Sequence, residues 1–484
     1  MDYIYSIGHL FDFAASGRKL SQRKTTPADS SRASGPPVSS IAGEQAGIYL
    51  RGLLEAKTGD RNFEDIAETV PGADHQRVQH FMCDAPWEAS KVLAWVSRQA
   101  DAALGGTPLS HLIVDESGFS KKGKFSAAVG RQYNGRLGKV DNCQVGVFTA
   151  LAAGRRVTLL EGRLYLPEDW ANHPARCEKA KIPVDERTFK TKSRIALEMI
   201  LTQRARGVRF GWVGMDAGYG KDPGLLRALE AAGETFVADI HSNQHLWEQD
   251  PQPAPVCRRA GHVPGTPVKP ASRRVTVKDW VARQSPDAWI PFKRRDGTNG
   301  SLRGDFLHAR VWLWDGAEEM ARCWHLVAWR ADEDATEIKY VLSNAAADIP
   351  LLDLARMAAS RFWIERALQD AKGAAGMGEY QMRGWVGWHR HMALVMLALF
   401  FILQQRLLLA EELPLLSAED VAWILEKYLP QPHATEEDIK KPLPADTGED
   451  KPISIQKKTG TRINSMIFYN TVELRTDCIV SLPG

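Results

Sequence analysis

Two aspartates stand at the ends of apolar runs that have the character of buried strands. Asp115 directly follows "HLIV", and Asp216 follows "VRFGWVGM" and precedes the turn-like "AGYG". In open α/β sheets, ligands bind at the carboxyl ends of such strands, so each aspartate is a candidate ligand for a metal or a substrate. An isolated acid at such a position is more often a turn residue, which is the alternative interpretation for both. Two acids in the same structural role favour a common site.

A third acid, Glu365, lies between two cations in the segment "SRFWIERALQDAKG". Arg361 precedes it by four residues, and Lys372 follows it by seven. In a helix these offsets place the three side chains within roughly 40° on one face. A surface ladder of charges has similar spacing and is the simpler interpretation of this segment taken alone. Together with Asp115 and Asp216, however, the segment completes a set of three acids on separate elements.

Three long blocks of the sequence resemble the DDE transposases of bacterial insertion sequences, most closely the insertion sequence 701 family. The blocks are "VDESGFSKKGKFSAAVGRQYNGRLGKVDNCQVGVF", "WVGMDAGYG" and "RFWIERALQDAKGAAGMGEYQMRGWVGWHRHMAL". The resemblance covers roughly residues 44–412. It implies that the catalytic and metal-binding acids are Asp115, Asp216 and Glu365, one from each block. Glu116, beside the first of them, is then expected to be a turn residue.

The family's wider pattern around the glutamate is Tyr-x2-Arg-x3-Glu-x6-Lys. This chain has Arg361, Glu365 and Lys372 in register, but Ala358 stands where the family has its Tyr. The resemblance implies that Arg361 and Lys372 bind the phosphates beside the scissile bond, which positions DNA without reading its sequence. The phosphate contact of the family's Tyr does not carry over to this chain.

The chemistry that the resemblance implies is metal-dependent cleavage of phosphodiester bonds. Two Mg²⁺ ions, or Mn²⁺ in their place, would activate an oxygen nucleophile and stabilise the leaving oxygen. Mg²⁺ prefers oxygen ligands, and three clustered carboxylates would repel one another without a cation. The implied reaction is cut-and-paste transposition, in which water cleaves at the transposon ends and the freed 3′-OH attacks target DNA. No G-x-x-x-x-G-K-[ST] sequence is present, so we expect no nucleotide cofactor.

Two other functions are compatible with the same residues. A degenerate or domesticated transposase would bind DNA without cutting it, and Ala358 slightly favours this alternative. A structure-selective nuclease of the same fold would cleave DNA without joining strands. The intact set of acids, together with Arg361 and Lys372, favours an active transposase over a degenerate one.

The elements that must position these residues predict an α/β protein. Helical spacing of apolar residues dominates first, and strand-like runs then alternate with helix-like segments. The resemblance implies a ribonuclease H-like core, a mixed sheet flanked by helices, which is interrupted by a β-rich insertion and preceded by an all-helical N-terminal domain. The expected segments are a flexible leader (1–43), a helical DNA-binding domain (44–108), the first part of the core (109–241), the insertion (242–345), the second part of the core with the helix of Glu365 (346–412), and a C-terminal helix with a poorly ordered tail (413–484).

Further DNA contacts are predicted in the insertion. In "FLHARVWLW", alternation puts the apolar residues on one face and Arg310, Trp312 and Trp314 on the other. A basic and aromatic face can bind phosphates and stack unpaired bases. For most of the tryptophans in the insertion, a place in the core is the more common role. The clearest local basic cluster, which could follow the DNA backbone or form a solvated loop, consists of Lys293, Arg294 and Arg295.

The implied partners are double-stranded DNA, both the terminal inverted repeats of a transposon and its target. Two transposon ends imply at least a homodimer on DNA. The net charge is only +3, so any DNA-binding surface must be local.

The compartment expected for the chain is the bacterial cytoplasm, in association with the nucleoid. The six cysteines include no C-x-x-C pair, which suits a reducing compartment. The start of the sequence lacks the pattern of a secretory signal. The longest apolar run, Met392–Leu403, is too short to span a bilayer and predicts a buried helix, so no membrane partner is expected.

Overall fold

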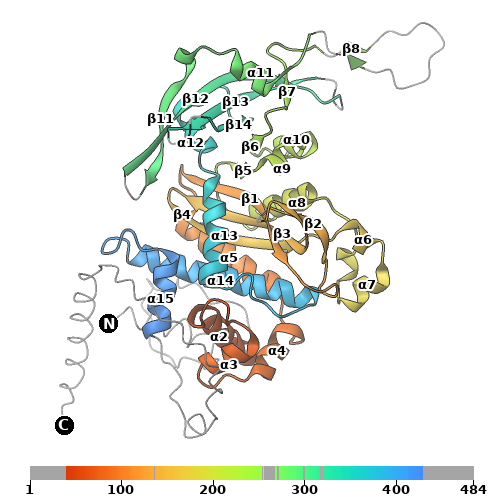
Figure 1. Cartoon of the computed structure of the whole chain (residues 1–484), viewed down its shortest axis with the longest axis vertical. Helices are drawn as coiled ribbons and strands as arrows, with labels where there is room; N and C mark the ends of the chain where they lie inside the picture. Colours follow the sequence, from red (N-terminus) through yellow and green to blue (C-terminus); the bar gives the residue numbers. More distant parts are fainter. Residues whose placement is uncertain are drawn as a thin grey trace, which may run out of the picture.

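The computed structural model describes residues 40–428 apart from short gaps. These gaps are residues 136, 253, 256–267, 270–271, 298–299, 317, 319, 333 and 335. Residues 1–39 of the expected leader and the expected tail beyond residue 428 lie outside the described residues. The described chain is a mixed α/β protein, in which helices flank one large mixed sheet (Figure 1).

The sheet has ten strands in the order β11-β12-β13-β14-β6-β5-β1-β3-β2, and β4 pairs with β3 beside β2. The central pairs β1–β5 and β5–β6 are parallel, and the other pairs of this sheet are antiparallel. The apolar half of β3, "VGVFTALAA", is buried almost throughout, as is typical of a strand covered on both faces. The strands are β1 (Ser110–Ser120), β2 (Gly130–Asn134), β3 (Lys139–Ala153), β4 (Arg156–Leu164), β5 (Val213–Met215), β6 (Phe236–Ile240), β11 (Ile290–Gly297), β12 (Gly300–Leu313), β13 (Arg322–Ala331) and β14 (Ile338–Ser343).

β1 is longer than its sequence pattern predicts. Its parallel partner β5 pairs only with residues 112–114, but its antiparallel partner β3 pairs along the whole of Ser110–Ser120. Asp115 and Glu116 therefore lie within a strand, and the expectation that Glu116 is a turn residue is wrong. Glu116 instead forms an ion pair of 2.6 Å with Lys192. The change from apolar to polar residues marks the end of pairing with one neighbour, while the strand itself continues.

The same two acids show which helices cover which face of the sheet. Asp115 contacts Arg361, which directly precedes α13 (Phe362–Ala374). Glu116 contacts the first residue of α8 (Lys192–Ala205). Successive side chains of a strand point to opposite faces, so α13 and α8 lie on opposite faces of the sheet. In Figure 1, α13 crosses in front of β3 and β4.

The longest helix, α14 (Trp385–Leu408), is the central helix of the core. By length and composition it could cross a membrane, but 78% of its most apolar window is buried inside the protein. It packs against β4, α5 (Ala89–Leu104) and α2 (Ser40–Glu55). The prediction of a buried helix over Met392–Leu403 is therefore confirmed.

The N-terminal helices pack directly on α14, at the bottom of Figure 1. Arg390 of α14, only 6% exposed, donates hydrogen bonds to the carbonyl oxygens of Phe81 (3.5 Å) and Trp87 (2.9 Å), and its guanidinium lies over the Trp87 ring. Tyr49 Oη and His391 Nδ1, 2.8 Å apart, join α2 to α14. These helices therefore share one hydrophobic cluster with the sheet. Two shorter helices complete the group, α3 (Phe63–Thr69) and α4 (His75–Cys83).

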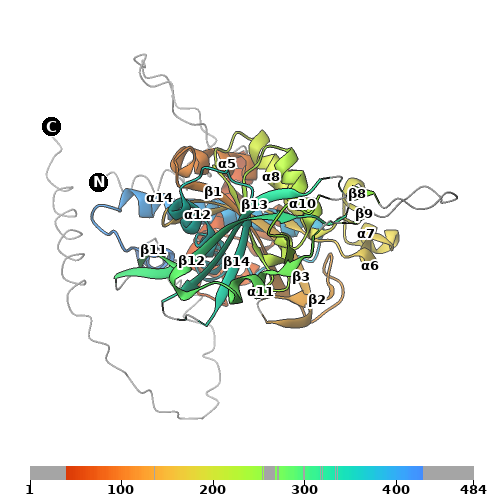
Figure 2. The ribbon, with the colours of Figure 1, turned by 90° about the horizontal axis from the view of Figure 1, so that it is seen from above.

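Strands β11 to β14 continue the sheet beyond β6 and form the top of Figure 1; Figure 2 looks down on this end of the molecule. β14 pairs with β6 from Ser343↔Val237 to Tyr340↔Ile240. The region expected as a separate insertion is thus joined to the core by main-chain hydrogen bonds, and its boundaries remain a prediction. Four of its tryptophans, each 4–7% exposed, confirm the expected place in the core: Trp247, Trp280, Trp324 and Trp329.

The remaining elements are short. Two small sheets lie between β6 and β11, one pairing β7 with β10 and the other β8 with β9. Their bounds are β7 (His245–Leu246), β8 (Ala254–Pro255), β9 (Val268–Lys269) and β10 (Val275–Thr276). The other helices are α6 (Glu168–Ala171), α7 (Pro174–Lys179), α9 (Ala217–Gly220), α10 (Pro223–Ala231), α11 (Val277–Ala282), α12 (Leu351–Ala358) and α15 (Ala418–Tyr428), with 3-10 turns at Val184–Glu186 and Pro286–Ala288.

Candidate active site

The parallel strands β1, β5 and β6 place three acids in one row, directly after the last residues that pair in parallel. Val114 of β1 pairs with Met215 of β5, and Met215 pairs in turn with Ala238 of β6. Because parallel strands run in the same direction, the next residue along each strand lies in the next row. The residues of that row are Asp115, Asp216 and Asp239.

Asp115 is partly buried beside other carboxylates. Its Oδ1 accepts a hydrogen bond of 2.7 Å from the backbone N–H of Glu116. Burial, and then the negative charge of Asp216, raise the pKa of Asp115 to about 7, while Arg361 acts in the opposite direction. This carboxyl therefore needs a further cation besides Arg361 to remain fully ionised at neutral pH.

Asp216 is fixed by the short helix that follows it. Its Oδ1 accepts hydrogen bonds from the backbone N–H groups of Gly218 (2.9 Å) and Tyr219 (3.3 Å), so Asp216 is the N-cap of α9. Aspartate is favoured at this position because it satisfies N–H groups that have no partner within the helix. The sequence "DAGYG" thus places the carboxylate at the end of β5 and holds it there. The turn and ligand interpretations of Asp216 are compatible, since capping uses Oδ1 and leaves Oδ2 available.

Glu365 meets these strands through Arg361. Arg361 Nη2 donates a hydrogen bond of 2.8 Å to Glu365 Oε1, and its Nη1 lies 3.5 Å from Asp115 Oδ2. Burial alone would lower the pKa of Arg361, but the surrounding carboxylates, Asp239 foremost, raise it above its ordinary value. Arg361 therefore reaches one of the predicted aspartates, a contact across the fold that the charge-ladder interpretation does not account for. Glu365 itself is half-exposed and pairs with Arg361 at the i,i+4 spacing of such a ladder, so its place beside the aspartates stays a prediction.

Asp239 is a fourth acid of the site, which the sequence analysis missed. Its Oδ2 accepts a hydrogen bond of 2.7 Å from Arg361 Nε. Burial raises its pKa, and Arg361 opposes this effect. The signal in the sequence is "TFVADIH", a further strand that carries an acid and follows the helix-like "DPGLLRALEAAG". A strand after such a crossover helix often joins its predecessor in parallel, which places its acid in the same row.

The donor chemistry of the site fits a hard divalent cation such as Mg²⁺ or Mn²⁺. The available atoms are carboxylate oxygens, and a cation would relieve the repulsion between Asp115 and Asp216. Among the described residues, no three Asp, Glu, His or Cys side chains are grouped as metal ligands. Arg361 gives a physical reason for this, because it holds Glu365 while it faces Asp115. The Arg361 contact occupies Oε1, one of the two oxygens that Glu365 could offer to a metal ion shared with the aspartates.

Of the other predicted DNA contacts, Lys372 is nearest to this site along the chain. It lies in the last turn of α13, two turns beyond Glu365 on the same side of the helix. Its proposed role at a phosphate stays a prediction. Ala358, in place of the family's Tyr, is buried at the end of α12, in a cluster that covers one face of β6 and of the strands β11 to β14.

The predicted aromatic and basic residues lie on β12 and directly after it, where their side chains are half-buried. Arg310 donates a hydrogen bond of 2.7 Å to the carbonyl of Cys323. Trp312 pairs its backbone with Trp247, and the ring of Trp314 packs against the Trp247 ring at 6.3 Å between centroids. These three predicted residues therefore have partners within the protein, and their contact with DNA stays a prediction.

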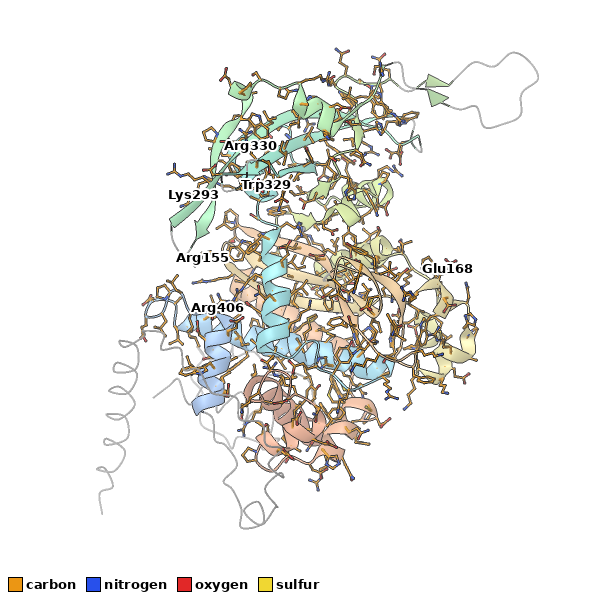
Figure 3. The ribbon with its side chains drawn as sticks, viewed as in Figure 1. Arg155, Glu168, Lys293, Trp329, Arg330 and Arg406 are labelled. Carbon is orange, nitrogen blue, oxygen red and sulfur yellow. The ribbon has the colours of Figure 1, made fainter. Side chains whose placement is uncertain are left out.

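The predicted basic cluster lies in a strand. Lys293, Arg294 and Arg295 belong to β11, so the alternative of a solvated loop is wrong. Lys293 is exposed on this edge strand (Figure 3). The side chains of Arg294 and Arg295 lie outside the described part of the structure. An exposed cation on an edge strand is compatible with backbone contact to DNA and also discourages pairing with other chains.

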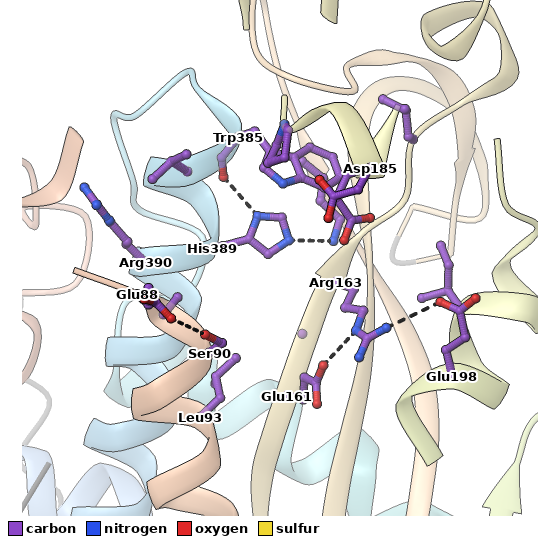
Figure 4. A pocket seen from close by; sticks show the side chains of 18 of the residues that line it. Glu88, Ser90, Leu93, Glu161, Arg163, Asp185, Glu198, Trp385, His389 and Arg390 are labelled. Carbon is purple, nitrogen blue, oxygen red and sulfur yellow. Dashed lines mark hydrogen bonds and ion pairs between the residues drawn. The ribbon is translucent and has the colours of Figure 1, made fainter. Parts of the chain in front are cut away.

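A cavity of about 560 Å³ lies elsewhere, between α14, β4 and the start of α5 (Figure 4). Several of its charged groups are paired within the protein: Arg163 forms ion pairs with Glu161 (2.7 Å) and Glu198 (3.5 Å). Burial lowers the pKa of His389 to about 4, and its Nδ1 lies 2.9 Å from the carbonyl of Trp385. A neutral histidine and satisfied ion pairs give this cavity a structural character, and the predicted acids do not line it.

Tyr219 places a buried hydroxyl beside the acids. Its side chain is 3% exposed, and its Oη has no hydrogen-bond partner among the described residues. Burial, and then the charges of Glu116, Asp115 and Asp216, raise the pKa of Tyr219 well above its ordinary value. The phenol is therefore neutral and carries the cost of an unsatisfied polar group.

Tyr219→Phe is expected to leave the melting temperature of the metal-free protein unchanged or slightly raised. The removed hydroxyl makes no hydrogen bond within the described residues, and burying such a group costs about 1–3 kcal/mol. The matched control is Tyr380→Phe, which removes a hydroxyl that donates a 2.8 Å hydrogen bond to Gln144 Oε1. The free energy of unfolding of this control is expected to fall by about 1 kcal/mol, which lowers its melting temperature. Equal destabilisation of the two variants in thermal unfolding would contradict this account of Tyr219.

Comparison with known proteins identifies similar sequences. The model of a family described as DDE superfamily endonuclease matches residues 41–301, more than half of the chain. The match includes Asp115, Asp216 and Asp239 and ends before Glu365. The probable transposase for insertion sequence element IS701 of Microchaete diplosiphon is 28% identical over 188 residues. This similarity covers 38% of the chain and 46% of that protein, so the chain spans about half the length of this relative.

Proposed function

Because the chain belongs to the DDE superfamily of endonucleases, we propose that it is a DNA transposase that cleaves at the ends of a mobile element and joins the freed 3′-OH to target DNA. The observation that carries the proposal is the meeting of Asp115 and Asp216, on neighbouring strands, with the Arg361–Glu365 pair at the start of α13. The similarity to a probable transposase supports the same activity. The mixed sheet with helices on both faces agrees with a ribonuclease H-like core.

In the proposed mechanism, Asp115, Asp216 and Glu365 would hold two divalent cations. Mg²⁺ or Mn²⁺ bound there would supply an activated oxygen nucleophile and neutralise charge on the leaving oxygen. The N-cap hydrogen bonds already hold the Asp216 carboxylate in place, so this side chain would need to move little to bind a cation. Arg361 and Lys372 bind phosphate oxygens beside the scissile bond and thereby orient it for attack.

The proposed partners are double-stranded terminal inverted repeats and target DNA, bound by a homodimer in the bacterial cytoplasm at the nucleoid. The N-terminal helices and the strands β11 and β12 are the proposed recognition surfaces. The residues proposed for these contacts are Lys293 on the edge strand β11, Arg310 and Trp312 on its neighbour β12, and Trp314 directly after β12. No nucleotide cofactor is included in the proposal.

The proposal is tested by incubating the purified full chain with a supercoiled plasmid that carries the element's ends, in the presence of Mg²⁺. We expect strand cleavage at the ends, 3′-OH termini, and joined products when target DNA is added. Removing divalent cations with EDTA is expected to reduce cleavage to the background level, because the carboxylates alone cannot stabilise the leaving oxygen. A plasmid with scrambled ends serves as the control for specificity.

Other outcomes would select the alternatives. Specific binding of the ends without Mg²⁺-dependent cleavage would indicate a degenerate or domesticated transposase that acts as a DNA-binding protein. Cleavage without joined products would indicate a structure-selective nuclease.

A further inference from the structure

The three nitrogens of the Arg361 guanidinium each face a different carboxylate. Nε contacts Asp239 at 2.7 Å, Nη2 contacts Glu365 at 2.8 Å, and Nη1 lies 3.5 Å from Asp115. The Arg361 side chain is 20% exposed, as is that of Asp239, so water screens these charges only partly. The single positive charge of Arg361 therefore interacts with acids from two strands, β1 and β6, and from the helix α13.

The three contacts are not equivalent. Asp115 and Glu365 are proposed metal ligands, and they meet the terminal nitrogens Nη1 and Nη2. Asp239 meets Nε, the nitrogen next to the aliphatic part of the side chain. Breaking the two terminal contacts can therefore free both ligands while the Nε contact keeps the guanidinium in place.

Asp239 is itself firmly held. It lies in β6 between two neighbours, β5 and β14, and pairs with Val341. Its carbonyl lies against Gly220 of α9, where an added Cβ would come within 1.9 Å of the oxygen. Glycine at this position lets α9 pack closely on the backbone of Asp239. The carboxylate that holds Arg361 is thus attached to one of the most constrained parts of the site.

We propose that Asp239 is a positioning residue that anchors Arg361 through Nε, so that the guanidinium can release Asp115 and Glu365 to divalent cations without leaving the site. The released Nη groups would then be available to a DNA phosphate beside the scissile bond. This inference rests on the proposed function of the site.

Two single variants are expected to change metal binding in opposite directions. Without the anchor, Asp239→Asn lets Arg361 pair more fully with Asp115 and Glu365, so the Mn²⁺ concentration that gives half-maximal thermal stabilisation rises about 10-fold, the size found for partners of metal ligands. Arg361→Gln removes the competing cation and lowers that concentration. Both values are measured with the full chain and Mn²⁺ alone, in the absence of DNA.

The double variant separates anchoring from a direct effect of charge. If Asp239 acts through Arg361, then Asp239→Asn has no further effect in the Arg361→Gln background. Asp239→Glu, which keeps a carboxylate, is expected to bind Mn²⁺ more nearly as the wild type does. The matched control is Asp305→Asn, which breaks the comparable 3.1 Å pair with Arg330 on the neighbouring strands and is expected to leave Mn²⁺ binding unchanged.

The inference is overturned if Asp239→Asn leaves the half-maximal Mn²⁺ concentration unchanged, or if it raises that concentration equally with and without Arg361. The second result would assign Asp239 a direct charge effect. Failure of the proposed function has a different signature: the wild type would not cleave DNA, whatever the Mn²⁺ titrations show. Asp115→Asn, which removes a proposed ligand, should abolish stabilisation by Mn²⁺ and thereby identifies the titrated site.

Discussion

Asp115→Asn is expected to reduce DNA cleavage by at least about 10³-fold, because each 1.36 kcal/mol of lost transition-state stabilisation lowers the rate tenfold and a metal supplies several kcal/mol. The metal-free protein should remain folded and no less stable. Burial and Asp216 already raise the pKa of Asp115 to about 7, so a neutral amide of the same shape replaces a carboxyl that is partly protonated at neutral pH. The cleavage rate on the plasmid substrate and the thermal unfolding curve measure the two effects.

The matched control for this variant is Glu116→Gln, one residue further along the same strand. Glu116 points to the opposite face and pairs with Lys192 at 2.6 Å, so its loss should spare cleavage. Cleavage by Asp115→Asn at the wild-type rate would remove Asp115 from the proposed active site. A large loss in Glu116→Gln as well would mean that the effect comes from the strand and not from the metal ligand.

The second large effect is expected in the stability of Arg361→Gln. In the absence of metal this variant leaves Asp115, Asp239 and Glu365 without their shared cation. Removing one partner of a buried ion pair costs 3–5 kcal/mol, so for these partly exposed groups we expect a loss of about 2–4 kcal/mol in the free energy of unfolding at pH 8. Millimolar Mg²⁺ should restore part of the loss, because a cation again balances the acids.

The loss in Arg361→Gln should depend on pH. The pKa of Asp115 in the folded wild type is about 7, against an ordinary value of 3.8. A carboxyl whose pKa is raised by folding binds its proton more tightly in the folded state, so its contribution to stability declines as the pH rises from about 4 through 7. Removing Arg361 raises the pKa further and deepens this decline, so the variant should lose less stability at pH 5.5 than at pH 8.

Urea unfolding at the two pH values measures this difference, and Arg330→Gln provides the matched control. Arg330 pairs with Asp305 at 3.1 Å, where both side chains are about a third exposed. Its removal is expected to cost less than about 1 kcal/mol. A loss in Arg361→Gln that is the same at both pH values would show that the raised pKa of the Asp115 carboxyl is not its cause.

The part of the site that the sequence could predict is the part that local spacing determines. Arg361 and Glu365 share a helical face because four residues make about one turn. The apolar runs before Asp115 and Asp216 indicate buried strands, and the resemblance to a known family connects the three acids. The mixed α/β architecture follows from the same alternation of strand-like and helix-like segments.

The features that the sequence did not predict depend on which strands pair with each other and in which register. The local pattern of residues does not encode this pairing. Asp239 joins the site because β6 lies next to β5 in a matching register. Glu116 looked like a turn residue because β1 loses its parallel partner at that point, whereas pairing with β3 continues to Ser120. Likewise, the strands expected in a separate insertion extend the core sheet, because β14 pairs with β6.

The shortest strand of the ten-stranded sheet, β5, lies at the site itself. β5 has only three residues, Val213–Met215, and it links the half of the sheet that ends in β11 to the half that contains β1 and β3. Any hinge bending between the two halves must therefore concentrate at β5 and would alter the spacing of the aspartates that flank it.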